Sequence, residues 1–385
     1  MFGSLQNFGK LGASGGTSNL IAQLFAGGTE GFASGLSVTE AYQKGWLFQD
    51  SAGTTPAAIE SPVGLALDSS QGLVLGPELV TNGDFSSGST GWTLGTGWSV
   101  SGGAASSAGG NQFASISQTI LATAGKRYLV SFDVSCTSGS LLIRLGGGTN
   151  LLNINATGKV TARLVAEGAG IAFLSNATGF EFVGSIDNIS VKELPGNHAT
   201  QSTSTKRFVL KDSGVYKYLL ADGADDHLLC AAEGGGTTGF FLIAGIKLGA
   251  VGAAQTIFSD TGTNTGYRVR INASNKLELA AGNGSAYTTV ETAATLALND
   301  SAVITAWHDG TNLNVQINGG TVAQAAFATA SAGTTGFTLF QDNGASTSYF
   351  KGNVAAILYT KNSAPNASLR AALQASINAS MGGVY

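Results

Sequence analysis

Short segments in which apolar and polar side chains alternate restrict most strongly what this chain can fold into. The clearest segment is residues 127–136, RYLVSFDVSC. Its apolar positions are Tyr128, Val130, Phe132 and Val134. A period of two predicts a strand with one buried face, and the same period recurs in residues 141–145 and 160–164. Several such strands, separated by Gly, Ser and Asn turns, predict an antiparallel β-sandwich.

Glycine supports the same conclusion, because it accounts for 56 of the 385 residues while proline accounts for 5. Glycine costs about 1 kcal/mol in a helix interior and suits tight turns between strands. We therefore expect an all-β fold, and the 43% of hydrophobic residues are enough to form packed cores. The net charge of −4, without a clustered Lys/Arg stripe, predicts that the chain binds no nucleic acid.

The patterns divide the chain into five parts. A Gly-rich anchoring arm over residues 1–45 and a stem segment over residues 46–76 come first. A jelly-roll sandwich is expected over residues 77–195, beginning at the stretch PELVTNGDFSSGSTGW. A polar connector over residues 196–210, the return of the stem, then leads to a second sandwich over residues 211–385.

The second sandwich contains the strongest hairpin signal and the one clear helix signal. Apolar and polar side chains alternate in residues 303–317 on both sides of an Asp309-Gly310 turn. The helix is expected from apolar and small residues at helical spacing, namely Leu369, Ala372, Leu373, Ser376 and Ile377. Ser363 or Asn366 could cap its start, and Gly382-Gly383 would end it.

The two cysteines, Cys136 and Cys230, fall in different expected domains, so we expect no disulfide framework and interpret both as small buried hydrophobes. No window approaches twenty apolar residues, and residues 1–16 lack the apolar segment of a signal peptide. We therefore expect no membrane insertion, no export by that route, and folding in a reducing cytoplasm.

The motif ELVTNGDFSSGSTGW opens the first sandwich, and SIDNISVKEL closes it. Together they resemble jelly-roll carbohydrate-binding modules of the family 4/9 type, over residues 78–194. The resemblance implies that the first and last strands lie side by side and that a structural calcium is held near them, with Asp84 and Asp187 as carboxylate ligands. Oxygen ligands suit calcium. From the residues alone, Asp84 in an Asx turn and Asp187 at a strand edge are an equal alternative.

The motifs KYLLADGADDHLL, at residues 217–229, and FKGNVAAILYTKNSAPNASLRAALQASINASM, at residues 350–381, resemble the opening and closing parts of concanavalin A-like, laminin-G-like lectin domains of phage origin. This resemblance covers residues 205–385. Two further segments, residues 47–72 and 196–210, resemble one continuous segment found ahead of such domains in tailed-phage structural proteins.

The resemblance implies that the first sandwich is inserted into that segment and starts near Leu73. Insertion is physically easy where the two ends of a domain lie close together on its surface. We therefore expect Gly72 and Gly196 to lie near each other.

Sugar-binding surfaces combine aromatic faces with planar polar side chains. In the first sandwich the candidates are Trp92 and Trp98, with Asn111 and Gln112 as polar neighbours. Burial of a tryptophan as core filler is at least as consistent with the sequence.

In the second sandwich the glycan-binding candidates are Tyr287, Asn343 and Tyr349, because they lie in turn-rich segments where recognition residues concentrate. Trp307 is in phase with Val303, so we expect it in the core. The run ADGADDH holds three aspartates that could bind a cation or form a tight polar turn: Asp222, Asp225 and Asp226.

Catalytic signatures are weak. No motif ties His198, His227 or His308 to a nucleophile. No expected strand carries the paired carboxylates of a glycosidase. The run GGGTTG, residues 234–239, precedes an expected strand rather than a helix, so it offers no phosphate site. We expect no enzymatic activity.

These resemblances imply a non-enzymatic structural protein of a phage virion, as a tail fibre, tail tip or capsid decoration assembled in the host cytoplasm. The arm would bind other virion proteins, and the sandwiches would bind host-surface glycans during attachment. A homo-oligomer, with a trimer favoured, is expected because weak sugar contacts gain from multivalency. The alternative is a bacterial secreted or surface protein that binds or degrades glycans.

Overall fold

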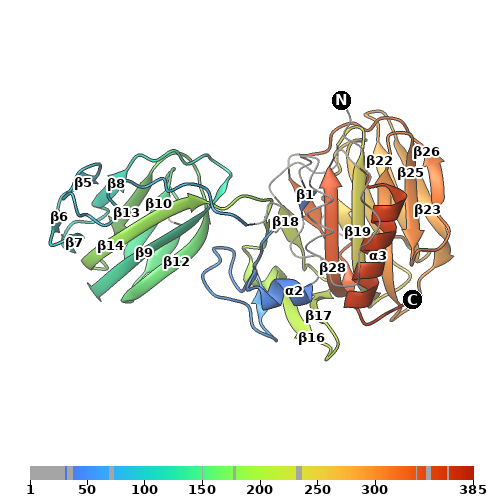
Figure 1. The fold of residues 1–385 in the computed structure, drawn as a ribbon, viewed down its shortest axis with the longest axis horizontal. Coiled ribbons are helices and arrows are strands. Elements are labelled where there is room, and N and C mark those ends of the chain that lie inside the picture. Colours follow the sequence, from blue (N-terminus) through green and yellow to red (C-terminus); the bar gives the residue numbers. More distant parts are fainter. Residues whose placement is uncertain are drawn as a thin grey trace. The chain divides into compact units, whose positions relative to one another are not determined.

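The computed structural model describes residues 31–32, 38–68, 73–149, 151–176, 179–230, 236–334, 336–343, 348–361 and 364–385. The chain forms two compact units (Figure 1). Unit 1 comprises Met1–Gln49, Pro56–Ser70 and Gly196–Tyr385, and unit 2 comprises Asp50–Thr55 and Gln71–Pro195. Both are built from antiparallel sheets, which confirms the all-β prediction. Most of the expected anchoring arm lies outside the described residues.

Unit 2 contains two antiparallel sheets that enclose one core. The β9 sheet has the order Gly158–Val165 (β12), Arg127–Ser138 (β9), Val183–Glu193 (β14), Ala104–Ala108 (β7) and Trp98–Ser101 (β6). The β13 sheet has the order Leu152–Ile154 (β11), Leu141–Leu145 (β10), Ile171–Ser175 (β13), Ser115–Gln118 (β8) and Thr93–Leu94 (β5). The expected alternation in β9 is observed: Val130, Phe132 and Val134 face the core, and Phe132 packs edge-on against Phe173 of β13.

The beginning and end of unit 2 lie side by side, as the resemblance implied. Glu78 forms an antiparallel bridge with Lys192. The Glu78 carboxylate also accepts hydrogen bonds from the Ser190 hydroxyl (2.5 Å) and from the Val191 amide (2.8 Å). Gly76 donates its amide to the Glu193 carbonyl at 2.9 Å. These bonds hold the first residues of the unit against its last strand.

Unit 1 contains two larger antiparallel sheets with an apolar core. The β19 sheet has the order Ala323–Ala326 (β26), Asn312–Ile317 (β25), Ser301–His308 (β24), Phe240–Leu248 (β19), Lys351–Lys361 (β28), Lys217–Asp222 (β17), Phe208–Asp212 (β16) and Pro62–Val63 (β3), and Gly31–Phe32 (β1) also pairs with β28. The β20 sheet has the order Leu47–Phe48 (β2), Leu65–Ala66 (β4), Ala199–Thr200 (β15), Leu228–Cys230 (β18), Phe337–Leu339 (β27), Gln255–Ser259 (β20), Tyr267–Ile271 (β21), Lys276–Gly282 (β22) and Tyr287–Thr295 (β23). A 3₁₀ turn, Ser204–Lys206 (η1), precedes β16.

Segments on either side of unit 2 in the sequence meet within unit 1. Strand β4 pairs with β15. Asp68 donates its amide to Nδ1 of His198 at 2.9 Å, and its carboxylate accepts the amide of Asn197 at 2.7 Å. A Cβ on Gly196 would lie 3.1 Å from the Asp68 carbonyl, so Gly196 lies against Asp68. Gly72 lies outside the described residues, so its approach to Gly196 stays a prediction.

Helix α3, Ala367–Ser380, packs on the outer face of the β19 sheet (Figure 1). Of the two candidate caps, Asn366 accepts the Leu369 amide at 2.9 Å, whereas Ser363 lies outside the described residues. The helix buries Leu373 and Ile377. A Cβ on Gly245 of β19 would come within 2.7 Å of the Ile377 side chain, so a glycine there allows the helix to approach the sheet.

The helix also covers Trp307, which is 3% exposed, as expected for a core residue. The Arg370 guanidinium lies 4.3 Å from the centre of its ring. Within the described residues, the structure contains no helix whose length and apolar character suit it to cross a membrane.

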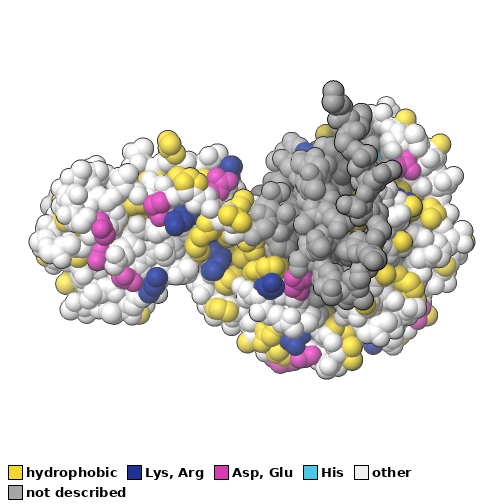
Figure 2. All heavy atoms as spheres, viewed as in Figure 1, with side chains coloured by type: hydrophobic (Ala, Val, Ile, Leu, Met, Phe, Trp, Pro, Cys, Tyr) yellow, Lys and Arg dark blue, Asp and Glu magenta, His cyan; other side chains and the backbone are white. Residues whose placement is uncertain are grey.

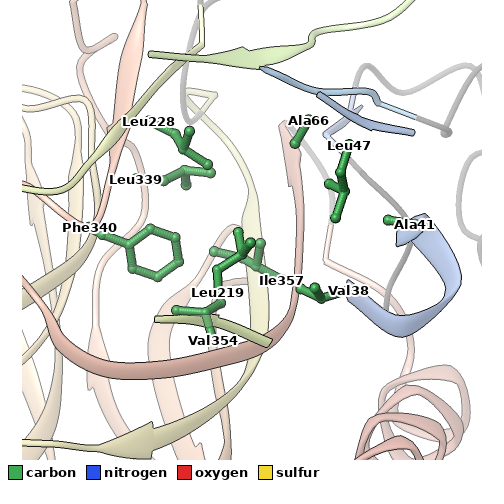
Figure 3. A pocket seen from close by; sticks show the side chains of 10 residues that line it. All are labelled: Val38, Ala41, Leu47, Ala66, Leu219, Leu228, Leu339, Phe340, Val354 and Ile357. Carbon is green, nitrogen blue, oxygen red and sulfur yellow. The ribbon is translucent and has the colours of Figure 1, made fainter. Parts of the chain in front are cut away.

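Helix α2, Val38–Gln43, contributes Val38 and Ala41 to the core of unit 1. A cavity of about 20 Å³ remains beside it, and Figure 3 shows side chains such as Leu47, Phe340 and Ile357 around this space. All ten lining side chains are apolar and the volume is near that of one water molecule. The cavity is therefore a small packing void of the core.

The cysteines lie in different units, and both are free thiols, in agreement with the expected lack of a disulfide between them. Cys230 is buried, and burial raises the pKa of its thiol well above the ordinary value. Cys136 is half-buried rather than fully buried. Its thiol lies 3.7 Å from the carbonyl oxygens of Ser138 and Gly139.

Candidate functional site

Both tryptophans proposed as a sugar platform in unit 2 are buried, with 7% of Trp92 and 6% of Trp98 exposed. The Trp92 indole N–H donates to the Asn82 carbonyl at 3.0 Å, and that of Trp98 donates to the Ala114 carbonyl at 3.1 Å. The Phe182 ring stacks on Trp98 with 6.1 Å between ring centres. A stacking platform needs an exposed face. The platform interpretation is therefore corrected to core filling for both residues.

The proposed polar neighbours of that platform are at least partly exposed. Asn111 donates its side-chain amide to the Gly109 carbonyl at 3.3 Å. It also lies against Gly97, since a Cβ on Gly97 would approach the Asn111 amide nitrogen to 2.6 Å. Gln112 is exposed at the tip of the same loop. Because the indoles are buried, these amides have no exposed indole beside them.

The candidate residues of unit 1 are held by separate loop contacts. The Tyr287 hydroxyl donates to the Gly262 carbonyl at 2.6 Å, and 37% of Tyr287 is exposed. Asn343 donates its amide to the Thr334 hydroxyl at 2.6 Å. The Tyr349 hydroxyl accepts the Gln341 amide at 3.1 Å. Glycan binding at Tyr287, Asn343 and Tyr349 stays a prediction.

The proposed calcium ligand Asp84 forms the Asx turn that was the alternative. Its carboxylate accepts the Ser86 amide at 3.2 Å and the Ser86 hydroxyl at 2.9 Å. These bonds lower the pKa of Asp84. Asp187 lies directly opposite Asp133 in the β9 sheet, and the Asn188 amide group contacts both carboxylates, at 2.9 Å from Asp133 and 3.3 Å from Asp187.

In the described part of the chain, one group of three acidic side chains has all its ligand atoms within 4.8 Å of one another: Asp222, Asp225 and Asp226. Carboxylate oxygens of this kind suit calcium. The same turn also binds itself, because Asp226 accepts the Asp222 amide at 3.0 Å and Asp222 accepts the Ala224 amide at 2.7 Å. Both sequence interpretations of this turn therefore remain, and a calcium ion here or at Asp84 and Asp187 stays a prediction.

The cross-strand pair Glu278 and Glu291 is the carboxylate arrangement that the sequence interpretation missed. The Arg270 guanidinium lies 2.7 Å from Glu278, and the Lys276 ammonium lies 2.6 Å from Glu291. The Lys276 hydrogen bond lowers the pKa of Glu291. A glycosidase needs one carboxylic acid with a raised pKa. The cations therefore favour a structural role for this pair.

The outer face of the β13 sheet carries a polar groove of about 330 Å³, which we call the β13 groove. Its position follows from the register of four strands. Thr93 of β5 lies opposite Ser117 of β8, Ser117 lies opposite Ala172 of β13, and Ala172 lies opposite Arg144 of β10. Side chains on one row of directly opposed residues point to the same face of a sheet. The small side chains of Ser117 and Ala172 leave the space into which the groove opens.

Two loops close one end of the β13 groove. Gly146 donates its amide to the Gly170 carbonyl at 2.7 Å. Gly146 has a φ of +69°, and a Cβ there would lie 2.2 Å from the Gly168 amide nitrogen. Only glycine fits at Gly146, because it alone tolerates this conformation and this close approach. The wall at this end is therefore made largely of backbone.

Strand β8 is bonded to the start of unit 2 at its Gln118 end, the same end that the two loops close. Gln118 accepts the Thr81 amide at 2.8 Å and donates to the Thr81 carbonyl at 2.9 Å. These two bonds hold β8 in place. Ser115 and Ser117 of this strand line the groove. The side chains of Thr93, Ser115, Ser117 and Arg144 that line the groove therefore come from strands.

The chemistry of the lining is hydrogen bonding plus one positive charge. Hydroxyl groups come from Thr93, Ser115, Ser117 and Thr119, and the guanidinium comes from Arg144. No aromatic ring and no carboxylate is among the described residues that line the groove. Such a lining can bind a polar ligand, but it holds no acid and base pair for hydrolysis.

Charged side chains are dispersed over the face of the molecule shown in Figure 2, where no continuous basic stripe is visible. That the chain binds no nucleic acid stays a prediction.

Residues 222–358 match the family described as the concanavalin A-like lectin/glucanases superfamily. The match lies wholly within unit 1 and covers its strands from the end of β17 to β28. The lectin-like resemblance of this region is thereby confirmed. No curated protein shows significant sequence similarity to the chain.

Solved structures with weak similarity include a pentraxin, a pair of laminin domains and a toxin domain. A heptameric SAP-like pentraxin from Limulus polyphemus is 12% identical, covers 40% of this chain and 75% of its own, and has a TM-score of 0.31. Domains LG4-5 of the mouse laminin α1 chain are 10% identical and have a TM-score of 0.32. The match covers 62% of this chain and 83% of the laminin chain. The binding domain of botulinum neurotoxin DC in complex with SialylT is 12% identical and has a TM-score of 0.33. The match covers 46% of this chain and 50% of the toxin domain. The chain therefore spans about half the length of the toxin domain.

Proposed function

We propose that this protein is a non-enzymatic glycan-binding protein whose unit 2 binds saccharides in the β13 groove. The observation that carries the proposal is the row Thr93, Ser117, Ala172 and Arg144, which places hydroxyl groups and a guanidinium around one open space. The volume of about 330 Å³ falls within the range of small-ligand sites, about 300–1,000 Å³.

Saccharides match this lining because each sugar ring carries several hydroxyl groups that both donate and accept hydrogen bonds. Serine and threonine hydroxyls do the same, and the arginine fork donates up to five N–H groups. The match of residues 222–358 to a superfamily of lectins and glucanases adds support for a binding role, although it concerns unit 1. The cations beside Glu278 and Glu291 favour binding over hydrolysis.

The wider role that we propose is display on a phage virion, as a tail fibre, tail tip or capsid decoration, with host attachment through glycans. Its support is the resemblance of the stem and of unit 1 to tailed-phage structural proteins. Virion partners of the N-terminal arm and a homotrimer belong to this proposal. Detection of the protein in purified particles would support it, whereas hydrolysis of a polysaccharide by the purified chain would favour a bacterial glycan-degrading protein.

The experiment for the binding site is a glycan array with two tryptophan variants. Ser117→Trp fills the β13 groove from its floor, and Ser99→Trp places the same side chain at an exposed position of the β9 sheet. We expect wild type and Ser99→Trp to bind the same glycans and Ser117→Trp to lose them. Equal binding by both variants, or no glycan bound by the wild type, would contradict the proposed site.

A further inference from the structure

Arg144 is the one charged side chain among the described residues that line the β13 groove. It lies on β10 opposite Ala172, whose small side chain leaves room beside the guanidinium. A guanidinium remains charged at any physiological pH, and its planar fork matches a carboxylate or sulfate. The groove therefore presents a permanent positive charge beside hydroxyl groups.

The carboxylate of Glu167 acts on Arg144 from outside the β13 groove. Glu167 is exposed and does not line the groove. Hydrogen bonds from Thr149 lower the pKa of Glu167, and the positive charge of Arg144 adds to this effect. Glu167 therefore remains ionised near Arg144 and attenuates its field. Its removal is expected to strengthen the attraction of the groove for an anion.

The lining also argues against a neutral sugar held by stacking. Sites for neutral pyranoses commonly rely on an aromatic face, and the two candidate indoles of unit 2 are buried in its core. Without a ring, binding energy must come from hydrogen bonds, and bonds to charged groups are about twice as strong as neutral ones. A ligand that carries both hydroxyls and an anionic group uses all of the lining.

We infer that the β13 groove selects acidic glycans, with the Arg144 guanidinium bound to a uronate carboxylate or a sulfate group and the hydroxyls of Thr93 and Ser117 bound to sugar hydroxyls. This inference rests on the proposed function, and it names the chemical class of the ligand. Carboxylate and sulfate share the chemistry that the arginine recognises.

The test measures binding of the full chain to three soluble probes: oligogalacturonate as the carboxylated glycan, dextran sulfate as the sulfated glycan and dextran as the neutral one. We expect wild type to prefer an acidic probe over dextran, with an affinity that falls as salt rises. Arg144→Gln should weaken that binding by about tenfold or more, and Arg144→Lys by less, because it keeps the charge but loses the fork. Glu167→Gln should strengthen it.

A matched control is Lys159→Gln, which removes an exposed cation from β12 on the other sheet. It should leave binding of the acidic probes unchanged. Thermal unfolding followed by tryptophan fluorescence checks that each variant folds, since Trp92 and Trp98 report on the core of unit 2.

The outcomes separate the two proposals. If dextran binds as tightly as the acidic probes, and Ser117→Trp abolishes both, the β13 groove binds glycans without selecting acidic ones and the inference fails alone. The inference is also overturned if Arg144→Gln and Lys159→Gln weaken acidic binding equally. If no probe and no arrayed glycan binds the wild type, the proposed function itself is wrong.

Discussion

The Tyr267 hydroxyl lies 2.7 Å from Nδ1 of His308 in the core of unit 1, where neither side chain is exposed to solvent. The hydroxyl also lies 2.7 Å from the Gly236 carbonyl, and Nε2 of His308 lies 3.0 Å from the Phe327 carbonyl. Burial lowers the pKa of His308, so the imidazole is neutral at pH 7. A proton on Nε2 then bonds to Phe327, and the single Tyr267 proton is shared between the Gly236 carbonyl and Nδ1.

Replacing Tyr267 with phenylalanine should destabilise unit 1 while leaving its apolar packing in place. The variant leaves Nδ1 of His308 and the Gly236 carbonyl without this partner inside the core. A buried polar group without a hydrogen bond costs about 1–3 kcal/mol, so we expect a loss of that size in the free energy of unfolding. Chemical denaturation measures it.

Tyr287→Phe is the control for this prediction, because its hydroxyl bonds to the Gly262 carbonyl at the surface, where water can replace it. The control should lose less than about 1 kcal/mol. Equal losses in the two variants would mean that the buried Tyr267–His308 pair contributes nothing beyond an ordinary tyrosine hydrogen bond.

Asp226 should make stability depend on pH in the acidic range. Burial, reinforced by the charges of Asp222 and Asp225, raises the pKa of Asp226 to about 6 from its ordinary value of 3.8. Below pH 3.8 the carboxyl is protonated in both states. Between pH 3.8 and 6 the unfolded chain releases this proton while the folded chain keeps it, so stability falls as pH rises through this window.

Asp226→Asn removes this charge and can still accept the Asp222 amide through its side-chain oxygen. We expect the variant to be more stable than wild type at pH 7, by on the order of 2 kcal/mol, and equally stable at pH 3. The difference between the two unfolding free energies, measured from pH 3 to pH 7, isolates this residue from the other carboxylates. A difference that does not change with pH would contradict the prediction.

Calcium chloride provides a second measurement on the same turn. An ion bound by Asp222, Asp225 and Asp226 would neutralise the three carboxylates, raise the melting temperature of wild type at pH 7 and leave Asp226→Asn less affected. If calcium shifts neither protein, this turn holds no calcium and acts as the polar turn that its internal hydrogen bonds describe.

The strands of this protein could be predicted from sequence because alternation is a local property. The segment Val130–Val134 and the hairpin around Asp309 show it directly, and the Asn366 cap and the C-terminal helix follow from equally local rules. The tryptophans could not be placed in this way. Trp92 and Trp98 lie beside glycines, a sequence pattern typical of an exposed loop. Their burial depends on contacts with Phe85 and Phe182, which come from irregular or distant segments.

The β13 groove could not be predicted for a different reason. Ser117, Ala172 and Arg144 are separated by many residues and carry no motif, and they become one site only through the register of β8, β13 and β10. Register depends on pairing between strands that are distant in the sequence. A site made of serine, threonine and glycine has no chemical signature in a chain this rich in those residues.

Trp98→Phe distinguishes core filling from sugar stacking. The variant keeps a ring beside Phe182 but loses volume and the hydrogen bond to the Ala114 carbonyl. We expect a loss of about 1–3 kcal/mol in the stability of unit 2, with glycan affinity of the folded protein unchanged. Loss of affinity at unchanged stability would restore Trp98 as a sugar platform. Denaturation and the glycan array together give both values.

Gly83→Ala should separate the start of unit 2 from its last strand. Gly83 accepts the Ile189 amide through its carbonyl at 2.9 Å, and a Cβ at this position would lie 2.1 Å from the Ile189 carbonyl oxygen. Backbone cannot move aside as a flexible side chain can, so the added methyl must displace the chain at Ile189. Overpacking of this kind costs about 1–3 kcal/mol, and we expect a loss of that size in the unfolding free energy of unit 2.

The matched substitution is Gly148→Ala, because a Cβ there meets no atom within 4 Å. It should leave stability within about 0.5 kcal/mol of wild type. Hydrogen exchange at the Ile189 and Val191 amides gives a local readout, since these amides bond to Gly83 and Glu78. Faster exchange in Gly83→Ala but not in Gly148→Ala would locate the damage where the two ends of unit 2 meet. Unchanged exchange in both variants would mean that the Gly83 contact does not hold these ends together.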